Sequence, residues 1–346
     1  MSAPKEQNGI SPKKGKAGAR ADLEQQVDEY LERGGKVTGC PTGEQHGISP
    51  KKVRGMSKGT IDLIKAMRVE AEKAQPITGR GIGYKLFVRG LIGSMGTADM
   101  KTVYRCLKIA RERGMIPWEW IVDESRALEV GLSWDSLHDY MDDMVESYCR
   151  DYWNEQPVRV QLWTEKGTVR GVCGPVLSKY GVGFRNVHGF NSATIVHDVA
   201  QDDDGRPLVI LYVGDYDPSG LCMSETDLPN RFKEYGGTHI KLKRVTLLAQ
   251  HTIDLGEQLS FPAADKRKDT RYPWFVENYG HRCWELDALD PNALRNMLET
   301  AILELIDQAA WDECKEAEED ERVAIKDMVR QWKANGGTEW GWREAQ

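Results

Sequence analysis

Three carboxylates follow two predicted strands, at positions where they could bind a divalent cation. Asp215 and Asp217 come directly after the apolar run Leu208–Val213. Glu165 follows an earlier segment, Val158–Thr164, in which apolar residues alternate. Ligands of open α/β sheets bind beyond the carboxyl ends of the strands, and side chains two apart in an extended chain share one side. Three clustered anions repel unless a hard cation lies between them, so we expect magnesium here.

The same residues have a plainer interpretation, a surface turn that caps a helix. Asp-x-Asp-Pro-x-Gly sequences often form such turns, and Pro218 and Gly220 suit a sharp turn into a helix. The acidic residue at the end of the earlier predicted strand, Glu165, favours the metal site. Both interpretations stand at this point.

Alternating predicted strands and helices surround these carboxylates and indicate a doubly wound parallel sheet. The run Leu208–Val213 is apolar throughout, as in a strand buried on both faces. Further elements are expected as helices at Thr168–Lys179, Ser192–Val199 and Ser219–Tyr235 and a strand at Ile240–Leu248. Asp290-Pro291 caps a predicted C-terminal helix, which passes Leu305 and is interrupted by a solvated acidic run, Asp312–Glu321.

Upstream of the sheet, the hydrophobic period predicts three short helices and an extended segment. These are expected at Lys58–Gln75, at Thr78–Gly90, at Thr97–Gly114 and, for the extended segment, at Met115–Val122. A cationic third helix in such an array is typical of a winged helix-turn-helix, in which that helix enters the DNA major groove. A helical bundle with an exposed basic face is the alternative. A further amphipathic helix is expected at Ser133–Trp153.

Charge is unevenly distributed along the chain of 346 residues. The net charge is −7, yet Lys51–Arg126 holds sixteen Lys and Arg against eight Asp and Glu, which leaves −15 elsewhere. Such asymmetry is expected when one module meets a polyanion and another uses carboxylates, although a solvated basic helix surface would also produce it. Seven scattered Cys without a C-x-x-C pair favour a reducing compartment.

The N-terminal segment, residues 1–54, is expected to be a flexible basic arm around one short helix. The hexapeptide Gly-Ile-Ser-Pro-Lys-Lys occurs at 9–14 and again at 47–52, which we interpret as a duplicated linker. The first 21 residues lack the apolar core of a signal peptide, and no stretch approaches the roughly 20 apolar residues that span a bilayer. We expect a soluble protein of the cytoplasm, associated with the nucleoid and without a membrane partner.

Together these motifs resemble a TOPRIM domain, which topoisomerases, primases and some nucleases share. The preceding basic winged helix narrows the resemblance to the A subunit of topoisomerase VI and the related meiotic double-strand-break transesterase. Further similar motifs are Trp163-Thr164-Glu165-Lys166, His188-Gly189-Phe190 and Glu285-Leu286-Asp287-Ala288-Leu289. The resemblance covers about Lys58 to Leu305. It implies an α/β fold class with a winged-helix DNA-binding domain over 55–155 and a parallel TOPRIM domain with C-terminal helices over 156–346.

In that family a catalytic tyrosine lies in an Arg-Asp-x-Tyr-Tyr motif on the winged helix. This chain has Arg80-Gly81-Ile82-Gly83-Tyr84, so two glycines replace the family's Asp and first Tyr. The resemblance implies that Tyr84 is the nucleophile and that Arg80 stabilises the phenolate or the phosphate. Because Tyr84, Phe87 and Leu91 also fit a core stripe along one helix face, a purely structural Tyr84 is the alternative.

The resemblance implies a magnesium-dependent DNA-cleaving transesterase, an isomerase of the topoisomerase class, that forms a 5′-phosphotyrosyl link. Magnesium on Glu165, Asp215 and Asp217 would polarise the scissile phosphate. In the family the tyrosine of one protomer meets the metal site of the other, which implies a homodimer on double-stranded DNA. The side chains expected to hold the DNA backbone are Lys58, Arg89, Arg105, Lys108, Arg111, Arg126, Lys266 and Lys268.

Two other functions compete with this one. In the first, the carboxylates activate water in a metal-dependent hydrolytic nuclease and Tyr84 only packs. In the second, the chain is a non-catalytic DNA-binding assembly factor, although clustered carboxylates are costly without a cation. The sequence contains no G-x-x-x-x-G-K-[ST] loop, so strand passage driven by ATP would need a separate ATPase subunit.

Overall fold

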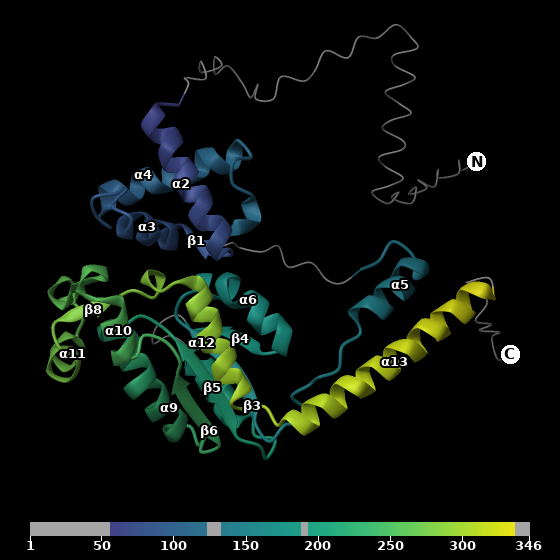
Figure 1. Ribbon diagram of the computed structural model, residues 1–346. Coiled ribbons are helices and arrows are strands. Elements are labelled where there is room, and N and C mark those ends of the chain that lie inside the picture. Colours follow the sequence, from purple (N-terminus) through teal and green to yellow (C-terminus); the bar gives the residue numbers. More distant parts are fainter. Residues whose placement is uncertain (1–55, 123–132, 188–192, 336–346) are drawn as a thin grey trace, which may run out of the picture.

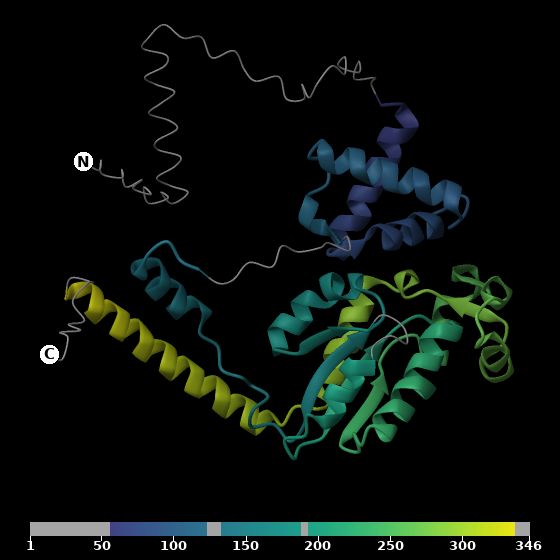
Figure 2. The same cartoon turned by 180° about the vertical axis from the view of Figure 1, so that it is seen from behind.

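The computed structural model of the chain describes residues 56–122, 133–187 and 193–335. They form a helical module, residues 56–122, and an α/β module, residues 156–306 (Figure 1). Two further helices, α5 (Leu137–Ser147) and α13 (Gln308–Ala334), lie together and extend to one side of the α/β module, as a view from behind also shows (Figure 2). None of the described helices is long and apolar enough to cross a membrane.

The helical module contains three helices where the hydrophobic period predicts them. They are α2 (Lys58–Ala74), α3 (Gly79–Val88) and α4 (Thr97–Glu112). Side-chain oxygens of Ser57 and Thr78 cap α2 and α3. The three apolar faces meet in one core, which includes Ile64, Met67, Ile82, Leu86, Val103 and Leu107.

The segment after α4 differs from the expectation of an extended chain. Met115–Val122 contains a 3-10 turn at Trp118–Trp120, and only Ile121–Val122 forms a strand, β2. This strand pairs in parallel with β1 (Ile77–Thr78). The guanidinium of Arg111 on α4 lies 4.2 Å from the centre of a Trp118 ring, which favours the turn over an extended chain.

The α/β module is built on a parallel sheet with the strand order β4-β3-β5-β6. Its strands are β3 (Arg159–Thr164), β4 (Gly183–Asn186), β5 (Leu208–Val213) and β6 (Ile240–Arg244). The expected parallel α/β sheet is therefore confirmed. Neither β4 nor the small antiparallel pair of β7 (Ser260–Pro262) and β8 (Arg282–Trp284) is anticipated from the sequence.

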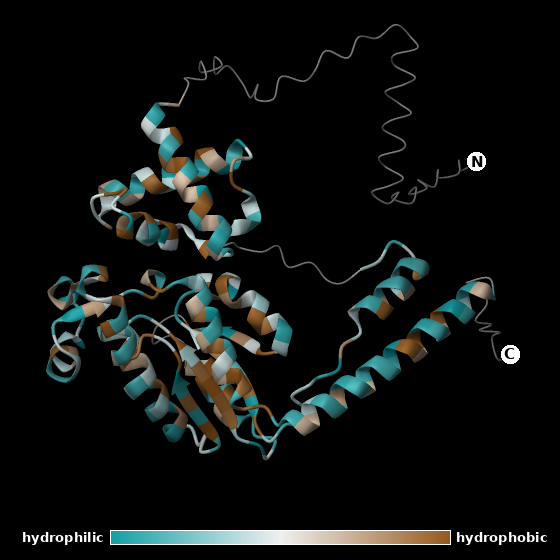
Figure 3. Ribbon diagram, in the orientation of Figure 1, coloured by the Kyte–Doolittle hydropathy of each residue, from teal (hydrophilic) through white to brown (hydrophobic). Residues whose placement is uncertain are grey.

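Helices cover both faces of the sheet. On one face the core contains α6 (Thr168–Tyr180) and α12 (Pro291–Leu303), and on the other it contains α7 (Ala193–Gln201) and α9 (Leu228–Glu234). Alternate side chains of β5 enter the two cores, and all six are buried, which explains its uninterrupted apolar run. Coloured by hydropathy, the central strands are brown between helices that are partly teal (Figure 3).

One strand of the module is shorter than expected, and one expected helix has nearly the expected bounds but contains a π-helical turn. The last strand of the sheet ends at Arg244, because Leu247 takes a left-handed φ of 49° and the chain then enters α10 (Ala249–Leu255). The expected helix Ser219–Tyr235 consists of α8 (Pro218–Cys222), a π-helical turn and α9. A helix over Tyr272–Tyr279, α11, was not anticipated.

The acidic run Asp312–Glu321 does not interrupt a helix, contrary to expectation, because it lies within α13. The interruption falls earlier, at Asp307, whose side chain caps α13. The run is also not wholly solvated. Glu318 is buried, accepts a hydrogen bond from the backbone N–H of Arg150 and pairs with Arg322.

The helix expected at Ser133–Trp153 is shorter, and α5 covers only Leu137–Ser147. Ser136 caps its first turn, so the helix begins after this residue. Beyond its end, the Trp153 indole N–H donates to the carbonyl of Tyr180 at 2.7 Å. This contact holds the chain against the α/β module in a non-helical conformation.

Asp290 caps α12, as the Asp-Pro pair predicts, and also joins the two modules. Its Oδ1 accepts the backbone N–H of Asn292 at 2.8 Å, and its Oδ2 pairs with Lys85 of α3. Burial opposes the charged carboxylate, but Lys85 and the backbone N–H groups outweigh it, so the pKa of Asp290 lies below its usual value.

Asp290→Ala is expected to lower the free energy of unfolding at pH 7 by about 1–2 kcal/mol, because α12 loses its cap. Asp290→Asn keeps a capping oxygen and is expected to lower it less. Because the folded-state pKa is lowered, the charge stabilises the fold above about pH 4, and this contribution is lost as the pH falls through the folded-state pKa. Urea unfolding at pH 7 and pH 3 measures both effects. Equal losses for the two variants at pH 7 would contradict the capping role.

Candidate active site

The three predicted metal carboxylates lie at the carboxyl ends of two neighbouring strands. Glu165 follows β3 directly, Asp215 is the second residue after β5, and Asp217 caps α8. β3 and β5 pair with Thr164 opposite Val213, so the two strand ends are level. The sheet therefore brings the three residues to one edge.

Glu165 is held by neutral partners. Its two oxygens accept hydrogen bonds from the Tyr212 hydroxyl at 3.2 Å and the Ser219 hydroxyl at 3.3 Å. Burial, together with the nearby negative charges of Asp217 and Asp215, raises the pKa of Glu165 above its usual value. A carboxylate in this environment would be stabilised by an added cation.

The two aspartates face lysines. An Oδ1 oxygen of Asp215 lies 2.8 Å from the Nζ of Lys166, which is also 3.0 Å from Asp287. Asp217 uses Oδ1 to cap α8, while its Oδ2 lies 3.2 Å from the Nζ of Lys266. Burial raises the pKa of Asp215, Lys166 opposes this, and the net direction is upward. One oxygen of Asp217 therefore caps a helix, as the plainer interpretation predicts, while its other oxygen faces the ammonium group of Lys266.

The carboxylates do not form a closed metal site in this arrangement. Among the described residues, no three or more His, Cys, Asp or Glu side chains are grouped to hold a metal ion. Magnesium in proteins commonly uses one or two carboxylates and keeps several waters. The hard oxygens of Glu165 and the aspartates fit that requirement, provided that the partly exposed Lys266 moves away from Asp217.

Tyr84 lies on α3 where the helical module meets the α/β module. The residue is 5% exposed, and its hydroxyl donates to the Glu285 carboxylate at 3.1 Å. Arg80 donates hydrogen bonds to the same carboxylate from both Nε and Nη2, and its guanidinium lies 5.9 Å from the centre of the Tyr84 ring. Burial and Glu285 raise the pKa of the Tyr84 hydroxyl, so the phenol is neutral at pH 7. Leu91, the last residue of the suggested core stripe, is 46% exposed.

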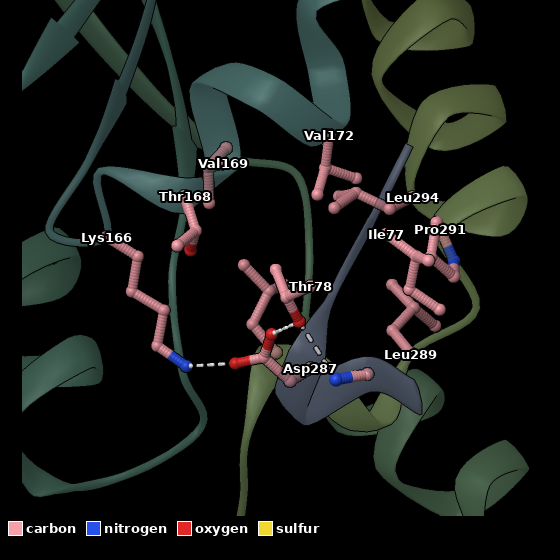
Figure 4. A pocket seen from close by; sticks show the side chains of 12 residues that line it. Ile77, Thr78, Lys166, Thr168, Val169, Val172, Asp287, Leu289, Pro291 and Leu294 are labelled. Atoms are coloured by element: carbon pink, nitrogen blue, oxygen red, sulfur yellow. Dashed lines mark hydrogen bonds and ion pairs between the residues drawn. The ribbon is translucent and has the colours of Figure 1, made fainter. Parts of the chain in front are cut away.

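The segment Glu285–Asp287 connects the tyrosine to the edge that carries the carboxylates. Glu285 binds Tyr84, and the next residue, Leu286, donates its backbone N–H to Asp215 at 2.7 Å. Asp287 accepts the Thr78 hydroxyl at 2.6 Å and pairs with Lys166, beside a largely apolar pocket between the modules (Figure 4). One short segment therefore binds α3 on one side and the acidic residues on the other.

Basic residues predicted to bind DNA are placed on α4 and elsewhere. Arg105 and Lys108 are exposed, and Arg111, three residues further along the same helix, is partly covered by its contact with Trp118. Lys108 also lies 3.7 Å from Glu112. The α4 face is thus cationic, as expected.

The remaining predicted DNA-binding residues do not share this face. Lys58 is exposed at the start of α2, and Arg89 pairs with Glu70 at 2.7 Å. Lys266 lies against Asp217 at the carboxylate edge, and Lys268, two residues further along the chain, is exposed. Arg126 and the motif at 188–190 lie outside the described residues.

Several residues of the site are assigned no role by the sequence. The motifs at 163–166 and 285–289 contain Lys166, Glu285 and Asp287. These motifs do not indicate which residues the three side chains contact. From the sequence, Arg244 and Tyr212 are expected only to belong to strands. Comparison with family models, with curated proteins and with solved structures finds no match for this chain.

Proposed function

We propose that this chain is a magnesium-dependent DNA-cleaving transesterase with a winged-helix domain before a TOPRIM domain, similar to the A subunit of topoisomerase VI. The observation that carries the proposal is the link from Tyr84 through Glu285 and Leu286 to Asp215. The chain thus has a phenol and a set of strand-end carboxylates, joined through one short segment, which are the kinds of nucleophile and cation ligand that phosphoryl transfer to tyrosine requires.

In the proposed reaction, Oη of Tyr84 attacks the scissile phosphorus and the bond from phosphorus to the 3′ oxygen breaks. The phenolic proton passes to a base, and Glu285, which already accepts it in a hydrogen bond, is the nearest carboxylate. The 3′ oxygen takes a proton from solvent. The products are a 5′-phosphotyrosyl link, which retains the phosphodiester energy for resealing, and a free 3′ hydroxyl.

Glu165, Asp215 and Asp217 would hold the magnesium, which when bound neutralises charge on the phosphate. Once Lys266 has left Asp217, its ammonium group is free to bind a DNA phosphate, in keeping with its predicted role. Because Tyr84 is 5% exposed, a phosphate reaches its hydroxyl only if α3 shifts against the α/β module.

The proposal includes a homodimer on double-stranded DNA, in the nucleoid. The resemblance implies that Tyr84 of one protomer acts at the carboxylates of the other. Strand passage would require a separate ATPase subunit, whereas cleavage would not.

A hydrolytic nuclease is the second candidate, and the environment of Tyr84 favours it. A phenol that is buried, hydrogen-bonded to a carboxylate and raised in pKa is a weak nucleophile in this arrangement. In that case the carboxylates would act on water and Tyr84 would join the modules.

Incubation with supercoiled plasmid and magnesium separates the two candidates. Reactions are stopped with detergent and run on gels with and without protease. The proposal predicts linear or nicked DNA that enters the gel only after protease treatment. Cut DNA that enters the gel without protease would instead favour hydrolysis, and uncut DNA would count against both enzymes.

A further inference from the structure

Arg244, the last residue of β6, is a buried cation behind the acidic loop, which we define as Gly214–Gly220. The residue is 7% exposed. Its hydrogen bonds all go to uncharged oxygens, and its Nε–H is buried without a hydrogen-bond partner among the described residues. Such burial is unfavourable for a guanidinium, and it lowers the pKa of Arg244.

The guanidinium binds both ends of the acidic loop. Nη2 donates to the carbonyls of Gly214 at 3.0 Å and Asp215 at 2.5 Å. Nη1 donates to the carbonyl of Gly220 at 2.8 Å and to the hydroxyl of Ser224 at 2.7 Å. The planar, forked group thus fixes the start of the loop, its end and the helix that follows, which a lysine with one point charge cannot do.

The two ends of the acidic loop approach each other closely, with the backbone of Asp215 against Gly220. A Cβ atom at position 220 would lie 2.3 Å from the carbonyl oxygen of Asp215, so only glycine fits there. The backbone of Asp215 therefore lies directly against Gly220, and the carbonyls of both residues accept hydrogen bonds from Arg244. Asp215 and Asp217, the proposed metal ligands, lie between the two fixed ends.

Arg244 is also connected to the third carboxylate. Its guanidinium lies 5.6 Å from the centre of the Tyr212 ring, and the Tyr212 hydroxyl donates to Glu165. A fixed positive charge at this position attracts Asp215 and Asp217 and offsets their mutual repulsion. A neutral donor could satisfy the carbonyls without the desolvation penalty, but it would lack this effect.

We propose that Arg244 is a positioning residue for divalent-metal binding, because it holds the acidic loop in the shape that presents Asp215 and Asp217 to a cation. The inference rests on the proposed metal site and is independent of whether Tyr84 attacks DNA. The inference predicts that the affinity for a divalent metal falls when lysine, with a single point charge, replaces the forked guanidinium of Arg244.

The test is direct binding of Mn²⁺ to the purified full-length chain without DNA, followed by electron paramagnetic resonance, with thermal unfolding as a check on folding. Carboxylate sites for magnesium also accept Mn²⁺. Arg244→Lys is expected to raise the Mn²⁺ dissociation constant by about tenfold, at the low end of the effect of residues that orient metal ligands. Arg206→Lys is the matched control, because Arg206 donates to the carbonyls of Trp153, Asn154 and Gln156, remote from the acidic loop.

The outcomes are distinct. Wild-type affinity in folded Arg244→Lys, an equal loss in Arg206→Lys, or no Mn²⁺ binding by the wild type would each overturn the inference. If Arg244→Lys does not fold, Ser224→Ala removes one of the four acceptors and is expected to weaken binding about threefold; unchanged binding would then overturn it. Normal Mn²⁺ binding that is weakened in Arg244→Lys, without any DNA cleavage by the wild type, would support the role of Arg244 and reject the proposed function.

Discussion

Tyr84→Phe is expected to abolish protein-linked DNA, with a loss of roughly 10⁴-fold or more, because it removes the attacking oxygen. The phenylalanine ring keeps the packing of Tyr84 between the modules and loses only the hydrogen bond to Glu285. That bond is worth about 1 kcal/mol, so the fold is expected to persist. The measurement is the fraction of plasmid that requires protease to enter a gel.

Tyr104→Phe is the matched control for this variant. Tyr104 belongs to the same helical module but is 46% exposed, so its hydroxyl is expected to be dispensable. If Tyr84→Phe cuts DNA at the wild-type rate, and the product does not depend on protease, Tyr84 is structural and the hydrolytic candidate is correct.

Asp215→Asn is expected to reduce magnesium-dependent cleavage by about 10³-fold or more, because a neutral amide is a poor ligand for a hard cation. The asparagine oxygen can still accept the N–H of Leu286, so the link to the Glu285–Asp287 segment is retained. The pairing with Lys166 is lost, which is a smaller effect since Lys166 keeps Asp287. Cleavage rates measured over a range of magnesium concentrations test the prediction.

Asp204→Asn is the control, since Asp204 pairs with Arg206 and Arg159 away from the acidic loop. Wild-type cleavage by Asp215→Asn would remove Asp215 from the proposed site. A similar loss in Asp204→Asn would indicate a general effect of removing an ion pair.

The two inactive variants together test the proposed homodimer. A mixed dimer of Tyr84→Phe and Asp215→Asn contains one intact tyrosine and one intact carboxylate set, on different chains. If the tyrosine acts across the dimer, mixing restores nicking of one strand. If each chain uses its own carboxylates, as the link from Tyr84 to Asp215 within one chain would also allow, mixing restores nothing.

The parallel sheet could be predicted because its signal is local. β5 is apolar at six consecutive positions and is buried on both faces, so its pattern and its environment agree. β4, in contrast, has the sequence Gly-Phe-Arg-Asn and lies at the edge of the sheet. Its strand character comes from backbone pairing with β3, which no pattern within four residues can indicate.

The candidate site was predictable where strand ends define it and unpredictable where distant segments meet. Glu165 and the aspartates follow strands, so topology alone places them together. The partner of Tyr84 is 201 residues away, and that of Lys166 is 121 residues away. Arg244 is the last residue of its strand, and nothing in the sequence of that strand indicates that its side chain binds the acidic loop. These contacts are seen only in the folded structure.

Transesterification by Tyr84 is tested by identifying the residue that carries DNA after cleavage. Complexes trapped with detergent are digested with nuclease and trypsin, and the peptides are analysed by mass spectrometry. Cleavage after Arg80 and Lys85 isolates a short peptide, Gly81–Lys85, with Tyr84 as its only hydroxyl side chain. We expect a nucleotide joined through its 5′ phosphate to this peptide. Free 5′ phosphate ends without a peptide, or a nucleotide on a different tyrosine, would contradict it.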